Sequence, residues 1–292
     1  MAKSPVLPLA LLFGSITLFG CTKQESTNGT STQSSTGSSL TQSASIAKTK
    51  LAIGSDMTFP PYEYLNEKGE PSGVDIDIMA KMAADNGTFT PEWIDTRWAN
   101  LIPGLTGKKF DVLFSSMYIT KERLKQIDMI PYYKTDISLL VRSDANLNPQ
   151  GPLDLCGQKV GTMKGTAFST QLQEISKTKC VEQNKPAITI SEYENSPQTT
   201  QALLSKAVDI QYDDAAVMRA ATKKLTNRVK ITSTQEFYPI VGGIGIRKGD
   251  TQTYKLISDG LEKMKASGEL TKLLDSYGLK AVSYTHLRAH ET

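Results

Sequence analysis

The sequence predicts an α/β fold in two lobes, and three observations favour this class. From residue 48 to residue 281, short apolar runs alternate with helical segments, which is typical of α/β layers with mostly parallel strands. Two stretches, NLIPGLTGKKFDVLFSS and QTTQALLSKAVDIQYDD, repeat one order of features: a helix, a basic corner, an aspartate, an apolar strand and a polar doublet. Any α/β protein can repeat in this way, but a segment of about 230 residues fits two lobes of about 100 residues each.

Apolar periodicity and turn residues place the elements within this segment. We expect strands at 50–55, 110–116, 138–143, 159–165, 208–214 and 242–249. We expect helices at 73–87, 100–109, 121–128, 166–176, 196–207, 253–267 and 268–278. The chain would cross between lobes at 131–144 and 232–246, so that lobe 1 comprises 48–140 plus 237–281 and lobe 2 comprises 141–236.

The N-terminal segment has the features of an export signal followed by a tether. Residues 1–20 contain one cation, Lys3, and an apolar run over 6–19 that is shorter than a membrane-spanning helix. The run ends in LFGC, which resembles the lipobox of bacterial lipoproteins with Cys21 as the lipidated residue; an ordinary secretory signal is the alternative. The Ser/Thr-rich stretch 21–47 has too few apolar groups to fold, and its reach is roughly 25–30 Å.

The other end and the cysteines exclude several kinds of chemistry. Residues 282–292 show no helix or strand period, hold both histidines, and are interpreted as a non-native tail. Neither histidine-based catalysis nor a metal site is therefore expected, and no cofactor is predicted. In an exported protein Cys156 and Cys180 favour a disulfide, with two free buried thiols as the alternative. A net charge of +3 with scattered basic residues gives no indication of nucleic-acid binding.

Two polar doublets mark the expected position of a ligand. Ser115-Ser116 and Asp213-Asp214 each follow a predicted strand, and ligands of open parallel sheets bind outside the carboxyl ends of strands. The first doublet continues as MYITKER, in which Thr120 is a good N-cap and Arg123 lies in the first helical turn. This segment is either a solvated basic helix start or an anion site made by the helix N-terminus and Arg123.

Five segments in this order resemble the family 3 extracytoplasmic solute-binding proteins, the receptors of polar amino-acid ABC importers. They are IGSDMTFPPYEY, GEPSGVDIDIMAKMA, WANLIPGLTGKKFDVLFSSMYITKERLKQIDMIPYY, KVGTMKGT and VDIQYDDAAV, and together they span essentially all of 48–281. The resemblance implies a periplasmic-binding-protein type II fold, α/β and two-lobed with two crossing hinge strands, that closes over one amino acid. It also implies a membrane permease as partner.

The resemblance assigns the charged ends of the ligand to named residues. Arg123 would bind the α-carboxylate through paired hydrogen bonds. Ser116, together with Thr166 and the amide of Ala167 at a helix start, would complete the carboxylate site. Asp214 would bind the α-ammonium.

The same resemblance assigns the side-chain end. Phe59 and Trp98 would form aromatic walls, while Asp56 and Ser115 would contact the distal polar group of the ligand. Asp213 is a further candidate because it is adjacent to Asp214. Since Asp56 disfavours a second carboxylate, we expect a cationic amino acid, with glutamine or another neutral polar amino acid as the alternative.

Each assignment has a structural alternative. Phe59 and Trp98 could pack the core of a lobe, Asp214 could serve only as a helix N-cap, and Asp213 could face solvent. Tyr118 departs from the family pattern, because many members have a small hydroxyl residue there; its phenol could narrow the pocket or donate to the ligand carboxylate.

The sequence thus predicts a monomeric, lipid-anchored, extracytoplasmic amino-acid receptor that is not an enzyme. A cyclohexadienyl dehydratase on the same scaffold is the alternative from another functional class. Such an enzyme needs a general acid, and Glu63 is the candidate for this role. A sensory module of a receptor or channel is a third possibility.

Overall fold

The structure is a computed structural model that describes residues 48–233 and 237–282. The predicted signal peptide, Cys21 and the tether lie outside the described residues, as does the predicted tail from 283 onward. Val282, the first residue assigned to that tail, is described and is buried. None of the helices that the structure describes has the length and apolar character needed to cross a membrane.

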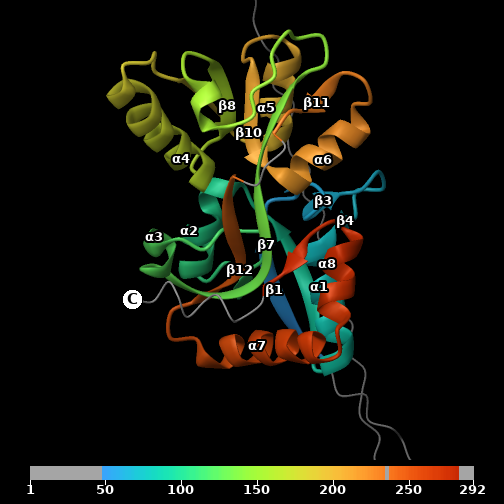
Figure 1. The fold of residues 1–292 in the computed structure, drawn as a ribbon. Coiled ribbons are helices and arrows are strands. Elements are labelled where there is room, and N and C mark those ends of the chain that lie inside the picture. Colours follow the sequence, from blue (N-terminus) through green and yellow to red (C-terminus); the bar gives the residue numbers. More distant parts are fainter. Residues whose placement is uncertain (1–47, 234–236, 283–292) are drawn as a thin grey trace, which may run out of the picture. The chain divides into compact units, whose positions relative to one another are not determined.

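The strands and helices follow the predicted alternation (Figure 1). The strands are β1 (Thr49–Ser55), β2 (Thr58–Phe59), β3 (Glu63–Leu65), β4 (Pro71–Ser72), β5 (Phe89–Asp95), β6 (Val112–Leu113), β7 (Ile127–Arg142), β8 (Lys159–Met163), β9 (Thr189–Tyr193), β10 (Ile210–Asp214), β11 (Val229–Ile231), β12 (Phe237–Arg247) and β13 (Lys280–Ala281). The α-helices are α1 (Val74–Asn86), α2 (Leu101–Thr106), α3 (Lys121–Leu124), α4 (Ala167–Ile175), α5 (Ser196–Leu204), α6 (Ala215–Lys224), α7 (Thr251–Ala266) and α8 (Glu269–Ser276).

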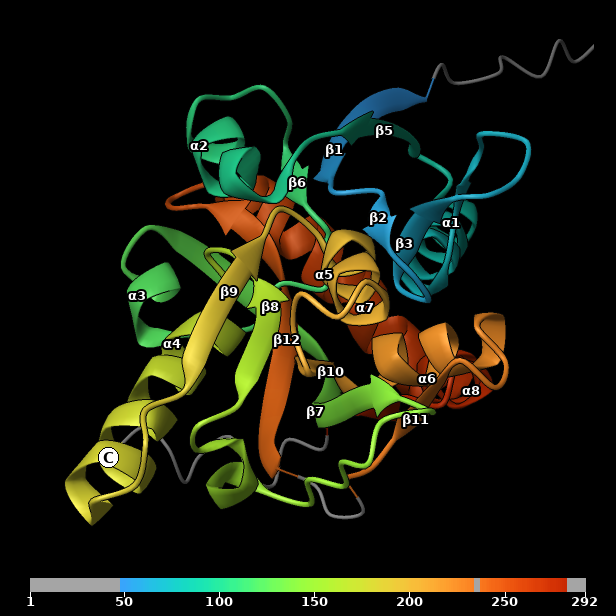
Figure 2. The same ribbon diagram turned by 90° about the horizontal axis from the view of Figure 1, so that it is seen from above.

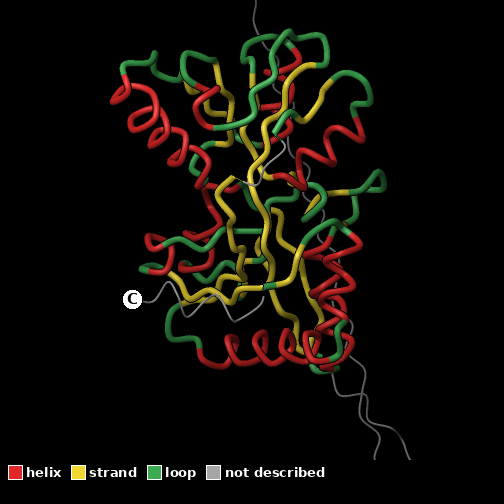
Figure 3. The backbone as a smooth tube through the Cα atoms, in the orientation of Figure 1, coloured by secondary structure: helices red, strands yellow, loops and turns green. Residues whose placement is uncertain are grey.

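Two long antiparallel strands, β7 and β12, form the centre of the main sheet (Figure 3). The strand order is β5-β1-β6-β12-β7-β10-β8-β9, with β11 and β13 paired to β7 beside this path. On the β12 side, β1 is parallel to both β5 and β6; on the β7 side, β8 is parallel to both β9 and β10. The two central strands therefore connect two separate groups of parallel strands.

Helices divide between these two groups in the same way (Figures 1 and 2). Helices α1, α7 and α8 pack together beside the group of β1, β5 and β6, which we call the first half. Helices α4 and α5 pack on the group of β8, β9 and β10, which we call the second half. The two polar doublets end β10 in the second half and follow β6 in the first half, as the repeated sequence pattern predicts.

Three differences from the predicted elements have local causes. Strand β5 contains Pro91, which lowers its strand signal; it lies at the sheet edge, where a missing N–H is tolerated. The helix predicted at 121–128 ends at Leu124, because the chain from Ile127 onward pairs with β12. Strand β9 was not predicted. Its sequence, TISEY, is short and mostly polar, so it carries little of the apolar pattern that identifies a strand.

The central strands approach each other closely at Gly242. A Cβ atom built there would lie 1.7 Å from Cε1 of Tyr133, so only glycine accommodates this ring. Tyr133 in turn donates its hydroxyl proton to the carbonyl of Ser116, 2.9 Å away. A glycine on β12 thus allows a tyrosine of β7 to hold the first polar doublet.

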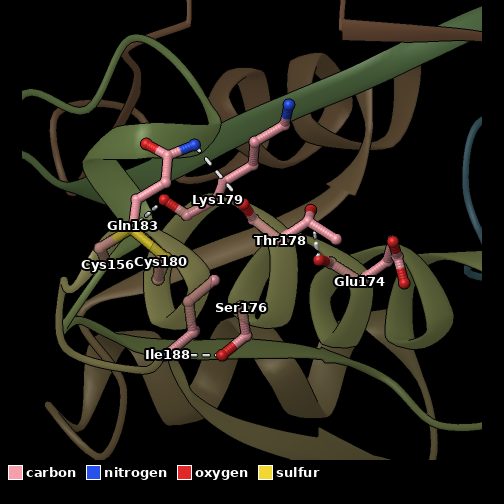
Figure 4. The surroundings of a disulfide bond; sticks show 8 residues. All are labelled: Cys156, Glu174, Ser176, Thr178, Lys179, Cys180, Gln183 and Ile188. Carbon is pink, nitrogen blue, oxygen red and sulfur yellow. Dashed lines mark hydrogen bonds between the residues drawn. A yellow bond between two sulfur atoms is a disulfide. The ribbon is translucent and has the colours of Figure 1, made fainter.

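The predicted disulfide between Cys156 and Cys180 is confirmed (Figure 4). The two cysteines are 24 residues apart and their Cα atoms are 5.4 Å apart. Close by, the hydroxyl of Ser176 accepts a hydrogen bond from the amide of Ile188 at 3.0 Å. In the chain-entropy model, closing a loop of this length adds about 3 kcal/mol to the free energy of unfolding. The disulfide also fixes the segment that follows α4.

Candidate functional site

A cavity between residues of both halves brings most of the predicted site together. Its volume is about 20 Å³, enough for about one water molecule and too small for an amino acid. Eight predicted residues line it: Asp56, Phe59, Trp98, Ser116, Tyr118, Arg123, Thr166 and Ala167. The cavity is also lined by Thr58, Glu63, Met163 and Phe168, which were not predicted to be part of the site. Ser115, Asp213 and Asp214 lie behind this lining.

Arg123 supplies a half-buried positive charge to the cavity. Its Nη1 donates to the carbonyl of Tyr118 at 2.7 Å, and its guanidinium carbon lies 5.2 Å from the ring centroid of Trp98. Burial lowers the pKa of Arg123 to about 10, so the group stays protonated at neutral pH. No carboxylate of the described residues forms an ion pair with it. A half-buried cation without an ion-pair partner favours an anionic ligand group.

The predicted N-cap at Thr120 is confirmed, but the anion site differs from the one expected. The Thr120 side chain accepts a hydrogen bond from the Arg123 amide at 3.2 Å and so starts the four-residue helix α3. The Arg123 side chain leaves this helix and turns back toward Tyr118. The guanidinium therefore reaches the cavity without any contribution from the α3 N-terminus.

Asp214 is fully buried and surrounded by hydrogen-bond donors. It caps α6 as expected, because Oδ1 accepts from the amides of Ala216 and Val217 at 2.7 and 3.1 Å. Three hydroxyl groups complete its surroundings, and their distances to the nearer carboxylate oxygen are 2.6, 2.8 and 3.1 Å for Tyr118, Thr135 and Tyr62 respectively. Burial raises the pKa of Asp214, and these hydroxyl groups act in the opposite direction.

Asp213 is buried as well, so the alternative that it faces solvent is wrong. Its Oδ2 accepts from Ser196 Oγ at 2.7 Å and from Gln211 Nε2 at 3.1 Å, while Oδ1 accepts from the Asp214 amide at 2.8 Å. Burial raises the pKa of Asp213 to about 6. The residue thus fixes the end of β10 from behind the cavity.

Asp56 lines the cavity with a carboxylate that already has partners. Its Oδ1 accepts from the Thr58 hydroxyl at 2.8 Å and pairs with Arg97 Nη1 at 3.2 Å; its Oδ2 accepts from the Trp98 amide at 2.8 Å. Burial raises the pKa of Asp56, and these contacts partly offset that effect. Ser115 supports Asp56 from behind by accepting its backbone amide proton at 3.0 Å.

The two aromatic residues predicted to form walls, Phe59 and Trp98, differ in solvent exposure. Phe59 is buried and stacks on Tyr62 with ring centroids 5.6 Å apart. Trp98 is partly exposed, and its Nε1 donates to the carbonyl of Gly165 in the second half at 3.1 Å. Trp98 and Arg123 also line a neighbouring cavity of about 320 Å³, so these two side chains separate the inner cavity from a larger one.

Two acids, Glu63 and Asp75, hold the Ser115-Ser116 turn; Glu63 is the general-acid candidate of the dehydratase alternative, and Asp75 was not among the predicted site residues. Ser116 has φ of 42° and donates its amide proton to Asp75 Oδ2 at 2.9 Å. The hydroxyl groups of Ser115 and Ser116 both donate to Glu63 Oε1 at 3.0 Å. Both Ser116 donors predicted to bind a ligand carboxylate are therefore bonded to acids.

Glu63 and Asp75 form a buried carboxyl pair. Burial raises the pKa of Glu63 well above its ordinary value and the charge of Asp75 raises it further; burial raises the pKa of Asp75 to about 7. Glu63 Oε2 is buried and accepts no hydrogen bond from a donor of the described residues. Glu63 lies on β3 and Asp75 lies on α1, so only the fold brings the two acids together.

Residues 51–280 match the model of the bacterial extracellular solute-binding proteins, family 3, and the chain belongs to this family. A probable histidine-binding protein of Neisseria gonorrhoeae is 29% identical over 230 residues, which cover 78% of this chain and 82% of that protein. No group of three or more potential metal ligands is clustered among the residues described here.

Solved structures agree with this assignment. An ancestral arginine-binding protein bound to glutamine aligns with a TM-score of 0.70 and 28% identity over 79% of this chain and 98% of that one. The ancestral amino-acid-binding protein AncCDT-1, a precursor of cyclohexadienyl dehydratase, aligns with a TM-score of 0.68 and 29% identity over 78% and 95% of the two chains. The predicted two-lobed periplasmic-binding-protein fold is confirmed.

Proposed function

We propose that this protein is an extracytoplasmic receptor that binds a polar amino acid between its lobes and delivers it to an ABC importer permease. The observation that carries this proposal is Arg123: a half-buried guanidinium without an acidic partner among the described residues, facing a cavity with aromatic walls. Such a group would bind the α-carboxylate. The amide of Ala167, at the start of α4, lines the same cavity and would add a donor.

The lobe boundaries predicted from the sequence belong to this proposal. Lobe 1 would comprise 48–140 plus 237–281 and lobe 2 would comprise 141–236, with β7 and β12 as hinge strands. Because the inner cavity is smaller than an amino acid, its walls must move apart for a ligand to enter. The bond between Trp98 Nε1 and Gly165 would break in that movement.

Lipid anchoring through Cys21 and a monomeric state remain part of the proposal. The Ser/Thr-rich stretch 21–47 would connect the lipid anchor to the folded part, near the membrane that contains the permease. The disulfide between Cys156 and Cys180 is consistent with export, because disulfides persist in oxidising extracytoplasmic compartments.

A binding role is favoured over catalysis by what surrounds Glu63. Its raised pKa would suit a general acid, and it lines the cavity. However, Oε1 is bonded to Ser115 and Ser116, and the carboxyl group is paired with Asp75. Its contacts support the turn that carries Ser116, which is a structural role.

For the side chain of the ligand, we propose a cation that reaches Asp56 between Phe59 and Trp98. Asp56 is buried and lines the cavity, and a cation there would replace the charge of Arg97, whose side chain is 49% exposed. Glutamine or another neutral polar amino acid is the alternative, because an amide can also donate to Asp56.

This ligand class predicts opposite effects of two substitutions. Asp56→Asn should weaken binding of L-arginine by at least about tenfold and binding of L-glutamine by less, because only the cation loses a charge partner. Arg97→Ala should strengthen binding of L-arginine about twofold to fivefold, because a half-exposed competitor for Asp56 is removed. Isothermal titration calorimetry measures both.

The matched control for this pair is Lys50→Ala, which removes a basic side chain that pairs with Glu92 on β5 away from the cavity. It should leave both affinities unchanged. If Asp56→Asn weakens the two ligands equally, the cation assignment is wrong, although the receptor function would stand.

A further inference from the structure

We propose that Tyr118 is a specificity-determining residue whose phenol competes with the α-ammonium of the ligand for Asp214. This inference rests on the proposed function, and it concerns how much the amino group of a ligand contributes to binding. It follows from the donors around Asp214, from the position of Tyr118 on the cavity wall and from the size of the cavity.

The Asp214 carboxylate has no free acceptor position. A carboxylate offers about four lone-pair sites. Two amides of α6, the Thr135 hydroxyl and the hydroxyl groups of Tyr62 and Tyr118 already donate to it. An α-ammonium can therefore bind Asp214 only if one of these donors leaves.

Tyr118 is the donor that separates Asp214 from the cavity. Of the two tyrosines, Tyr118 lines the cavity and has the shorter bond to Asp214, 2.6 Å. Tyr62 is fully buried between Phe59 and Tyr133, with ring centroids 5.6 and 5.0 Å away, and it does not line the cavity. A group that approaches Asp214 from the cavity meets the Tyr118 ring first.

The Tyr118 side chain can be exchanged without loss of the carboxylate site. Its backbone carbonyl binds Arg123 Nη1, and its backbone bridges to Gly242 of β12. Neither contact uses the phenol, which packs edge-on against Phe168 at 5.3 Å. Substitution of the side chain should therefore change the ammonium end of the site and leave Arg123 in place.

The cavity volume supports the same conclusion. At about 20 Å³ it accommodates roughly one water molecule, so the walls must yield to any amino acid. When the ring yields, the ammonium–Asp214 contact forms at the expense of a short phenol–carboxylate bond. The net gain from the amino group is then the difference between two bonds to one carboxylate, which is smaller than the gain at a free acid.

The test compares ligands with and without the amino group. Calorimetry would measure the dissociation constants of L-arginine and guanidinovalerate, and of L-glutamine and glutaramate, for the wild type, Tyr118→Thr and Tyr118→Phe. The quantity of interest is the dissociation constant of the des-amino compound divided by that of the amino acid. We expect this ratio to rise at least about tenfold in Tyr118→Thr and several-fold in Tyr118→Phe.

The matched control is Tyr132→Phe, which removes another buried phenol hydroxyl that is bonded to an acid, Asp75, outside the cavity lining. The ratio should stay at its wild-type value in this variant. Thermal unfolding verifies that each variant folds, and Tyr118→Phe keeps the ring, so the test does not depend on Tyr118→Thr alone.

The outcomes separate this inference from the function on which it rests. If the wild type binds an amino acid and the ratio stays within about twofold in both Tyr118 variants, or changes equally in Tyr132→Phe, the competition by Tyr118 is refuted and the receptor function stands. If neither the wild type nor any variant binds an amino acid, the proposed function and this inference fall together.

Discussion

Arg123→Ala is expected to weaken amino-acid binding by at least about 100-fold, on the order of 3 kcal/mol, while the protein stays folded. Arg123 is the basic residue that lines the inner cavity, and its loss leaves a ligand carboxylate buried without a counter-charge. The free energy of unfolding should not fall, because a desolvated cation without an ion-pair partner among the described residues is removed. Calorimetry and denaturant titration measure the two quantities.

The control for this substitution is Arg123→Lys, which keeps the charge but loses the planar fork and the stacking against Trp98. It should bind with an affinity between those of the wild type and Arg123→Ala. Binding within threefold of the wild type in the alanine variant would remove Arg123 from the site.

The second large effect is a dependence of stability on pH that originates in Glu63 and Asp75. Both carboxyl groups have raised pKa values in the folded protein because they are buried, and that of Asp75 reaches about 7. The folded state therefore binds more protons than the unfolded chain, where the pKa of an aspartate is about 4. The resulting stabilisation is present below about pH 4 and is lost as the pH rises through 7.

Asp75→Asn is expected to remove the part of this dependence that Asp75 contributes, whereas the part due to the burial of Glu63 remains. The difference in the free energy of unfolding between the wild type and the variant should change by up to about 4 kcal/mol between pH 4 and pH 8, in the direction that favours the wild type at low pH. Urea titrations at several pH values measure it. Asp77→Asn, on the same helix and bonded to Tyr277, is the control and should keep the wild-type slope.

The groups that face this pair do not supply an opposing charge. Tyr132 donates to Asp75 at 2.5 Å, Tyr133 lies beside both acids, and burial raises the pKa of each phenol well above its ordinary value. Ser115 and Ser116 contribute hydroxyl groups. A difference between the wild type and Asp75→Asn that is independent of pH would contradict the raised pKa of Asp75.

Of the residues predicted from the sequence to bind the ligand, eight line the cavity, whereas Ser115, Asp213 and Asp214 do not. Arg123 and both doublets are positioned by the N-cap at Thr120, by the turn that follows β6 and by the end of β10 at Asp214. These features can be recognised without any knowledge of side-chain contacts. The Cys156–Cys180 pair followed from composition and export alone. These features depend on local sequence and on the topology of the sheet.

What could not be predicted depends on contacts between side chains that are far apart in the sequence. Tyr118 meets Asp214 across 96 residues, and Glu63 meets Ser115 across 52, so neither contact has a local signal. Asp213 was interpreted as a possible surface residue, since nothing in VDIQYDD shows that Ser196 lies over it. Such long-range contacts determine whether a carboxylate is free to bind a ligand or already accepts hydrogen bonds from protein donors at all its acceptor positions.

The most direct test of the central claim is a thermal-shift screen of the purified protein against the twenty amino acids and ornithine, followed by calorimetry of each compound that shifts the midpoint. We predict that a cationic amino acid binds with one ligand per chain. At 100 times its dissociation constant, this ligand should add about 2.7 kcal/mol to the free energy of unfolding. If no amino acid shifts the midpoint and none is detected by calorimetry, the protein is not an amino-acid receptor.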